Sequence, residues 1–171
     1  DATSSPPWDA ADERPLVVVA MSSTFQDQAE TLRRVVAALS ELPVRAVVSL
    51  GPTLSIDEVP GAANVFVAES LPHADLIPRA SLLITHCGHG TAIKGLAAGI
   101  PMVCIPMGRD QGDNAARIVR AGAGLKLKRS AKTSKIRAAV ERVMTDPCYR
   151  DAAERLARAI AEGVGDSNPV S

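Results

Sequence analysis

Six short apolar runs, each of strand length, alternate along the chain with segments of helical character. The runs are LVVVAM (16–21), VRAVVSL (44–50), NVFVA (64–68), SLLIT (81–85), MVCIP (102–106) and GLKL (124–127). Continuous apolar runs of this length are typical of strands that are buried on both faces. Their alternation with helices predicts an α/β fold, a Rossmann-like parallel sheet of about six strands with helices on both faces.

The segments between these runs contain helix signals. Thr24 can cap a first helix, and Pro43 ends it. The apolar residues of this helix fall on one face. Further helices are predicted over 73–80, 91–99, 113–122, about 136–144 and about 147–162. Gly99 and Gly122 are well placed to terminate the two helices that they follow, because glycine readily adopts the left-handed conformation found there.

The length of 171 residues is that of one compact domain. Residues 1–15, DATSSPPWDAADERP, are rich in Ser, Pro and Asp and are typical of a linker. We therefore expect a remnant of an interdomain linker over 1–15, one folded domain over 16–163 and a flexible tail over 164–171.

Charge and composition narrow the possible partners. Nineteen basic residues balance nineteen acidic ones, and aromatic residues make up only 2% of the chain, so a nucleic-acid partner is not expected. The three scattered cysteines indicate free thiols in a reducing compartment. The apolar run PLVVVAM is too short to span a membrane and lacks a charged leader, so we expect a cytoplasmic protein.

The segment THCGHGTAIKG (85–95) is the richest in chemistry-bearing residues. His86, Cys87 and His89 are metal-ligand types, but consecutive residues at the end of a strand point in different directions, which disfavours a zinc site. Cys87 beside His86 is also a weak nucleophile–base pair, because no third group orients the base. A dinucleotide fingerprint requires its third glycine three residues after Gly90, whereas Gly95 follows five residues later.

The fourth interpretation, a phosphate-binding turn, uses the most residues of this segment. Gly88 and Gly90 let the backbone approach a ligand closely, and the helix that follows presents unpaired N–H groups at the positive end of its dipole. Thr91 adds a hydroxyl, and His86 can add a donor from the end of the strand. Such a site also lies where open α/β sheets bind ligands, beyond the carboxyl ends of their strands.

The stretch from NVFVA to RAGAG (64–124) resembles the donor-binding signature of family 1 glycosyltransferases, most specifically in THCGHGT, AAGIPMVCIP and RDQGDNA. The resemblance extends from about Pro15 to Glu162. It implies the C-terminal half of a two-domain GT-B enzyme that transfers sugar from a UDP- or TDP-sugar with inversion. It also implies similarity to bacterial natural-product glycosyltransferases, with a small-molecule acceptor.

The resemblance assigns roles to matching residues. The donor diphosphate is expected at His86, Gly88, Gly90, Thr91, Ser22 and Ser23. Asp110 and Gln111 match the Asp-Gln pair that binds the hydroxyl groups of the sugar, a role that suits a carboxylate acceptor beside an amide.

The nucleoside end departs from the family pattern at two positions. Lys94 stands where relatives carry a glutamate that accepts bonds from the ribose, and an ammonium group only donates. Ser70 stands where relatives commonly offer an aromatic ring to the base. Backbone groups near Leu71 and the side chain of His73 complete the expected nucleoside residues.

No catalytic residue is expected in this chain, because the resemblance places the base, usually a histidine, on a missing N-terminal domain. We expect no metal and no cofactor, and as partners a nucleotide sugar and the missing acceptor-binding domain in cis. Three alternatives remain open: a separate donor subunit of a two-chain transferase, a GT-B-like sugar-nucleotide epimerase, and a non-catalytic nucleotide-binding module.

Overall fold

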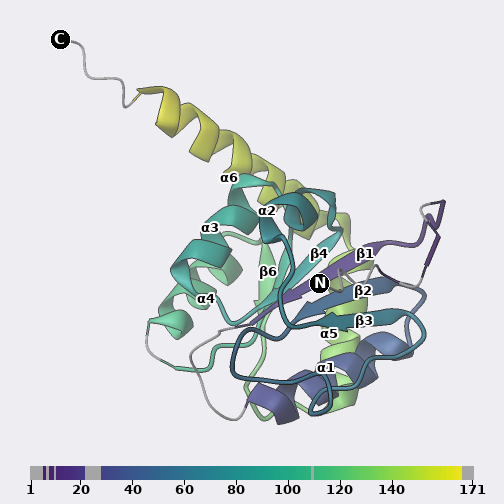
Figure 1. Ribbon diagram of the computed structural model, residues 1–171. Helices are drawn as coiled ribbons and strands as arrows, with labels where there is room; N and C mark the ends of the chain where they lie inside the picture. The colour runs from purple at the N-terminus through teal and green to yellow at the C-terminus, as the bar shows by residue number, and fades with distance from the viewer. Residues whose placement is uncertain (1–5, 7, 10, 22–27, 109, 167–171) are drawn as a thin grey trace.

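The six apolar runs form one parallel sheet, as predicted. The computed structural model describes residues 6, 8–9, 11–21, 28–108 and 110–166. Its strands are β1 (Leu16–Ala20), β2 (Arg45–Ser49), β3 (Val65–Ala68), β4 (Leu82–Thr85), β5 (Met102–Cys104) and β6 (Gly124–Lys126). They lie in the order β3-β2-β1-β4-β5-β6, and every neighbouring pair is parallel (Figure 1).

Helices connect the strands at nearly the predicted positions. They are α1 (Gln28–Ser40), α2 (His73–Leu76), α3 (His89–Ala97), α4 (Gln111–Arg120), α5 (Thr133–Thr145) and α6 (Pro147–Asp166), with a 3₁₀ turn η1 (Ile77–Arg79) after α2. Gly99 and Gly122 adopt positive φ angles of 72° and 82° just after α3 and α4, as expected. The predicted cap Thr24 lies outside the described residues.

The two faces of the sheet bury separate cores because alternate residues of a strand point to opposite sides. Val17 and Val19 of β1 belong to a core that α1 and α5 cover. Val18 and Ala20 belong to a second core, which α3, α4 and α6 cover. Figure 1 shows these two helical layers on either side of the strands. Across the described chain, no helix is both long and apolar enough to pass through a membrane.

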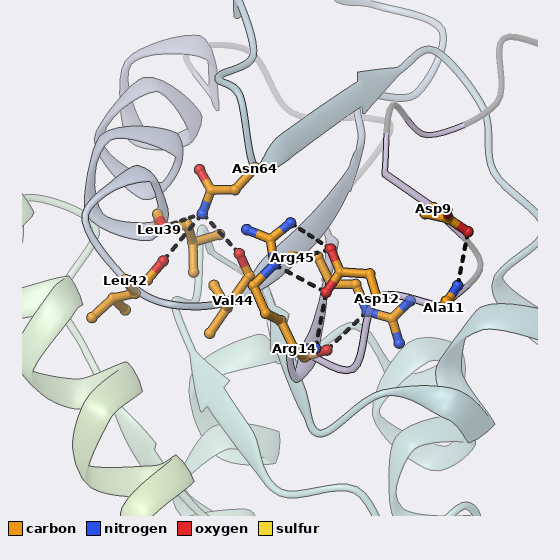
Figure 2. Close-up of polar contacts among 9 residues, drawn as sticks. All are labelled: Asp9, Ala11, Asp12, Arg14, Leu39, Leu42, Val44, Arg45 and Asn64. Atoms are coloured by element: carbon orange, nitrogen blue, oxygen red, sulfur yellow. Dashed lines mark hydrogen bonds and ion pairs between the residues drawn. The ribbon is translucent and has the colours of Figure 1, made fainter.

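Described residues of the predicted linker contact the domain. The backbone N–H of Arg45 donates to the Pro15 carbonyl, and its Nε donates to the Arg14 carbonyl at 2.8 Å. The Arg14 guanidinium contacts Asp12 at 2.6 Å and lowers the pKa of that carboxyl to about 2 (Figure 2). Trp8 is partly buried against the second core. The division into linker, domain and tail remains a prediction, although α6 continues to Asp166.

The buried side-chain amide of Asn64, just before β3, bridges the turn between α1 and β2 (Figure 2). Its Nδ2 donates to the carbonyl groups of Leu39, Leu42 and Val44 at 2.9, 3.2 and 2.8 Å. The Leu39 carbonyl lies in the last turn of α1, and those of Leu42 and Val44 follow the helix, where intrahelical partners run out. The carbonyls of Leu39 and Leu42 also accept the backbone N–H groups of Leu42 and Val44. Asn64 therefore connects the end of α1 to the two strands at one edge of the sheet.

We expect Asn64→Ala to lower the free energy of unfolding by about 1–3 kcal/mol, because it removes a buried donor from three carbonyl groups, of which those of Leu39 and Leu42 keep one backbone partner each. Asn64→Asp has nearly the same shape but places an acceptor against acceptors, so it should cost more at neutral pH. Its stability should partly recover as the pH falls and the buried carboxyl gains a proton that it can donate. Urea unfolding of the three proteins at pH 7 and pH 4.5 tests this, and equal stabilities would refute the role of the amide.

Candidate nucleotide-binding site

The candidate site lies where the order of the strands reverses direction, between β1 and β4. The chain proceeds from β1 toward β2 and β3 on one side, and from β4 toward β5 and β6 on the other. Ala20 at the end of β1 pairs with Thr85, and Thr85 pairs with Cys104 at the end of β5. The connections on the two sides diverge at this point, which makes it the usual ligand site of an open α/β sheet.

His86 directly follows β4 and is 8% exposed. Its Nδ1 lies 3.4 Å from the carbonyl oxygen of Ala20. Because a carbonyl oxygen only accepts, we assign the hydrogen of the neutral ring to Nδ1, which leaves a lone pair on Nε2. Burial lowers the pKa of His86, and the hydrogen bond to Ala20 opposes this shift only in part.

The two residues after His86 are constrained in different ways, Gly88 by space and Cys87 by its backbone conformation. A Cβ at Gly88 would lie 2.4 Å from Nε2 of His86, so only glycine leaves room for the imidazole. Cys87 has a φ of 67°, in the left-handed region that non-glycine residues rarely adopt. Its N–H donates to the Thr85 hydroxyl at 3.1 Å, which supports this conformation.

The Cys87 thiol contributes to the core below the loop rather than to a reactive site. Cys87 and Cys104 are both fully buried in the second core. The neighbouring thiol of Cys87, together with burial, raises the pKa of the Cys104 thiol. Among the described residues, no group of three or more His, Cys, Asp and Glu side chains could hold a metal ion.

Helix α3 directs its N-terminus into the site. The N–H of Ala92 makes the bond to the Gly88 carbonyl at 2.9 Å, and the amides of His89, Gly90 and Thr91 precede it. A Cβ built at Gly90 would meet no atom within 4 Å, so this position opens onto free space. Gly95, in contrast, packs closely on the sheet, where a Cβ would lie 2.6 Å from Met102.

Helix α4 brings the candidate sugar-binding residues to the same edge. Asp110 is exposed at the helix N-cap, and its carboxylate makes no capping hydrogen bond. Gln111 is 5% exposed, and its Oε1 accepts the N–H of Met107 at 2.8 Å. Asn114, one turn further on, donates through Nδ2 to the Cys87 carbonyl at 3.0 Å. This last bond joins α4 to the loop that contains His86 and Gly88.

The candidate nucleoside residues are only partly brought together. His73 and Lys94 line one cavity of about 360 Å³ between α2 and α3, whose other walls are mainly apolar. Burial and the nearby Lys94 ammonium both lower the pKa of His73, and its Nε2 is buried with no hydrogen-bond partner in the described part of the chain. Leu71 packs against the second core, and Ser70 is exposed outside this cavity.

Sequence reasoning missed three contributors to the site: the Ala20 carbonyl, Asn114 and the Met107 N–H. Two of these are backbone groups, which no residue type reveals. Asn114 stands within the RDQGDNA segment, but its contact with Cys87 depends on how α4 packs. Ser22 and Ser23 lie outside the described residues, so their predicted contact with phosphate remains a prediction.

Comparison with known proteins identifies the family. The family model "Erythromycin biosynthesis protein CIII-like, C-terminal domain" matches residues 33–169. The chain belongs to this family. The resemblance to donor-binding domains of glycosyltransferases is thereby confirmed.

Two named relatives illustrate the match. A PGL/p-HBAD biosynthesis glycosyltransferase of Mycobacterium tuberculosis is 33% identical over 148 residues, which cover 86% of this chain and 34% of the relative. The 4'-demethylrebeccamycin synthase of Lentzea aerocolonigenes is 33% identical over 151 residues, which cover 87% of this chain and 35% of the relative. The chain therefore spans about a third of the length of these relatives.

Solved structures share the fold. The spinosyn rhamnosyltransferase SpnG complexed with thymidine diphosphate has a TM-score of 0.80 and 30% identity, and the match covers 92% of this chain and 44% of SpnG. The calicheamicin glycosyltransferase CalG4 has a TM-score of 0.81 at 24% identity, over 96% of this chain and 47% of that protein. The predicted GT-B-type α/β domain is confirmed.

The contrast between Gly88 and Gly90 gives a stability test. We expect Gly88→Ala to cost about 1–3 kcal/mol of unfolding free energy, because the new methyl group collides with the His86 ring. Gly90→Ala should cost nothing and can stabilise α3 by about 0.5–1 kcal/mol, because alanine favours a helix. Urea unfolding measures both changes. If Gly88→Ala is as stable as the wild type, the close contact between Gly88 and His86 is incorrect.

Proposed function

We propose that this chain is the donor-binding half of an inverting glycosyltransferase that moves a sugar from a UDP- or TDP-sugar to a small-molecule, natural-product-like acceptor. The observation that carries the proposal is the open backbone at the start of α3, beside a buried His86, at the switch point of the sheet. The named relatives support sugar transfer over epimerisation or a non-catalytic role. They also contain the matched region within longer single chains, which favours a partner domain in cis.

The diphosphate is proposed to lie over the first turn of α3. The amides before Ala92 and the Thr91 hydroxyl would donate to its oxygens, and Gly90 leaves space for close approach. Each charge-assisted hydrogen bond contributes about 1.5–3 kcal/mol, and the helix dipole adds about 0.3–1 kcal/mol. A few such bonds suffice to hold a diphosphate without a metal ion.

The same groups would assist the reaction. When the bond between the anomeric carbon and the phosphate oxygen breaks, negative charge grows on the leaving nucleoside diphosphate. Donors that are already fixed at the start of α3 stabilise that charge without reorganising. The base that removes the proton of the acceptor is proposed to lie on the domain that this chain does not include.

The sugar is proposed to lie against the first turn of α4. The Asp110 carboxylate is exposed and makes no capping bond, so it is available to accept from sugar hydroxyl groups. Gln111 is mostly buried, and its Oε1 already holds the Met107 N–H. We therefore propose that Asp110 makes the direct contact, and that Gln111 also fixes the loop before α4.

The nucleoside is proposed to pass between α2 and α3. The Lys94 ammonium can donate to ribose oxygens but cannot accept. The imidazole of His73 adds ring nitrogens to the same cavity. The neighbour SpnG, solved with thymidine diphosphate, supports a pyrimidine nucleotide as the donor. The missing aromatic ring at Ser70 predicts weak binding by this chain alone, since a stacking partner contributes about 1–3 kcal/mol.

Calorimetry of this chain with UDP, TDP and UDP-glucose tests the proposal. We expect weak binding by the wild type and at least about a tenfold loss, or 1.4 kcal/mol, in Gly90→Ala, because the methyl group occupies the space of the phosphate. Gly163→Ala in α6 makes the same change at another exposed helical glycine where a Cβ meets no atom within 4 Å, so it is the control and should bind like the wild type. Absence of binding for every ligand, or unchanged binding by Gly90→Ala, contradicts the proposed phosphate position.

The protonation of His86 gives an independent test. Nε2 must gain a proton before it can donate to phosphate, because Nδ1 donates to Ala20. Burial lowers the pKa of His86 in the free protein below its ordinary 6.5, and a bound anion raises it. UDP-glucose affinity should therefore rise as the pH falls through the pKa of the complex, and level off below the pKa of the free protein.

Binding isotherms of UDP-glucose between pH 5 and pH 8 in two buffers measure this proton uptake. UDP-glucose is suitable because its phosphates do not titrate in that range. His86→Asn keeps a donor toward Ala20 but does not titrate, so its affinity should be flat with pH. A flat profile for the wild type would exclude His86 as a phosphate donor.

A further inference from the structure

Two neighbouring cavities at the carboxyl edge of the sheet are lined mainly by basic residues. The first, of about 850 Å³, lies between the first turns of α1 and the segment after β6. The second, of about 570 Å³, lies between that segment and the start of α5. They share Lys128 and Ser130. Of the described residues that line the two cavities, seven are Lys or Arg and one, Glu30, is acidic.

Contacts within the first cavity hold its arginines in place. Arg34 pairs with Glu30 at 2.8 Å and donates through Nη2 to the Arg129 carbonyl at 2.7 Å. Arg33 donates through Nε to the Glu58 carbonyl at 2.7 Å. The Arg34 Nε is buried and has no hydrogen-bond partner among the described residues. The guanidinium groups of Arg33 and Arg34 are therefore positioned in advance, and the Glu30 carboxylate, the one carboxylate among the described lining residues, offsets only part of their charge.

The lysines of the second cavity have no such partners. Lys126, Lys128, Lys132 and Lys135 are exposed, and none of them makes an ion pair or side-chain hydrogen bond with another described residue. The chain as a whole has a formal net charge of zero. Basic charge is therefore concentrated on this part of the surface, where it would attract anions.

We propose that these two cavities form a second anion-binding site, which takes a small molecule that bears several phosphoryl groups. Arginine and lysine are the side chains that bind phosphate oxygens most readily, and the Ser130 hydroxyl can add a further donor. The walls are concave, which suits a small polyanion that enters them. The flat surface of a membrane would contact only the tips of the lysines.

This site is separate from the proposed donor site. Most of the residues that line the basic cavities belong to α1, α5 and the segment after β6, whereas α3 and α4 cover the opposite side of the sheet. Lys126 is the exception, because its Nζ lies 3.9 Å from a Cβ built at Gly112 in α4. None of the described residues proposed to bind the nucleotide sugar lines either cavity. A ligand here therefore does not compete with the nucleotide, and the site does not depend on the proposed function.

The probe is inorganic tripolyphosphate, titrated into this chain with and without saturating UDP. We expect binding in both conditions, with amide NMR shifts at Thr31 and Ser130 and none at Thr91. The exposed pair Lys128→Glu/Lys132→Glu should weaken tripolyphosphate binding by at least about tenfold and leave UDP binding unchanged. Arg155→Glu/Arg158→Glu on α6 removes the same charge elsewhere and should bind tripolyphosphate like the wild type.

Three results would overturn the second site. Displacement of tripolyphosphate by UDP would place it in the donor site. An equal loss in both double variants would show a response to net charge alone. Binding to phosphatidylserine vesicles without binding of tripolyphosphate would assign the lysines to a membrane surface. If UDP fails to bind while tripolyphosphate still gives the expected shifts, the donor proposal fails and the second site stands.

Discussion

The parallel pairing of β1 with β4 is the constraint on which the candidate site depends. It places Ala20 opposite Thr85, so that the next residue, His86, reaches the Ala20 carbonyl across the two strands. A shift of this register by one residue would turn the side chains of β4 to the opposite face of the sheet. The apolar residues Leu83 and Ile84 belong to different cores, so the burial of both faces fixes the register and, with it, the position of the imidazole.

The sequence predicted those parts of the fold that local patterns determine. The apolar runs identified the six strands because most of them are buried on both sides; Val17, Val18 and Val19 are each 0% exposed. The edge strand β6 is the exception, since Leu125 is half-buried and Lys126 is exposed. Gly99 and Gly122 marked the ends of α3 and α4 because few other residues tolerate the positive φ found there. The single amide at Asn64 was not foreseen, because its partners lie about twenty residues earlier in the chain.

The candidate site also has a part that local sequence patterns predicted and a part that depends on contacts between distant segments. His86, Gly88, Gly90 and Thr91 lie in one short segment, so residue types and spacing sufficed to propose a phosphate turn. Contacts between distant segments could not be predicted. The His73–Lys94 cavity depends on the packing of α2 beside α3, and the Cys87–Cys104 contact depends on the neighbouring strands β4 and β5. Gln111 matched a sugar-binding pattern, yet its buried Oε1 also has a local partner in Met107.

The hydrogen bond from Asn114 to the Cys87 carbonyl ties the phosphate turn to the helix that begins with the proposed sugar contacts. The diphosphate and the sugar of a bound donor would therefore contact two segments that are hydrogen-bonded to each other, instead of two independent loops. Energies measured for residues on either side of such a link do not add, because a displacement of one side is felt on the other. Substitutions at the start of α4 that change the preferred sugar would consequently also change how tightly the phosphate turn binds the leaving nucleoside diphosphate.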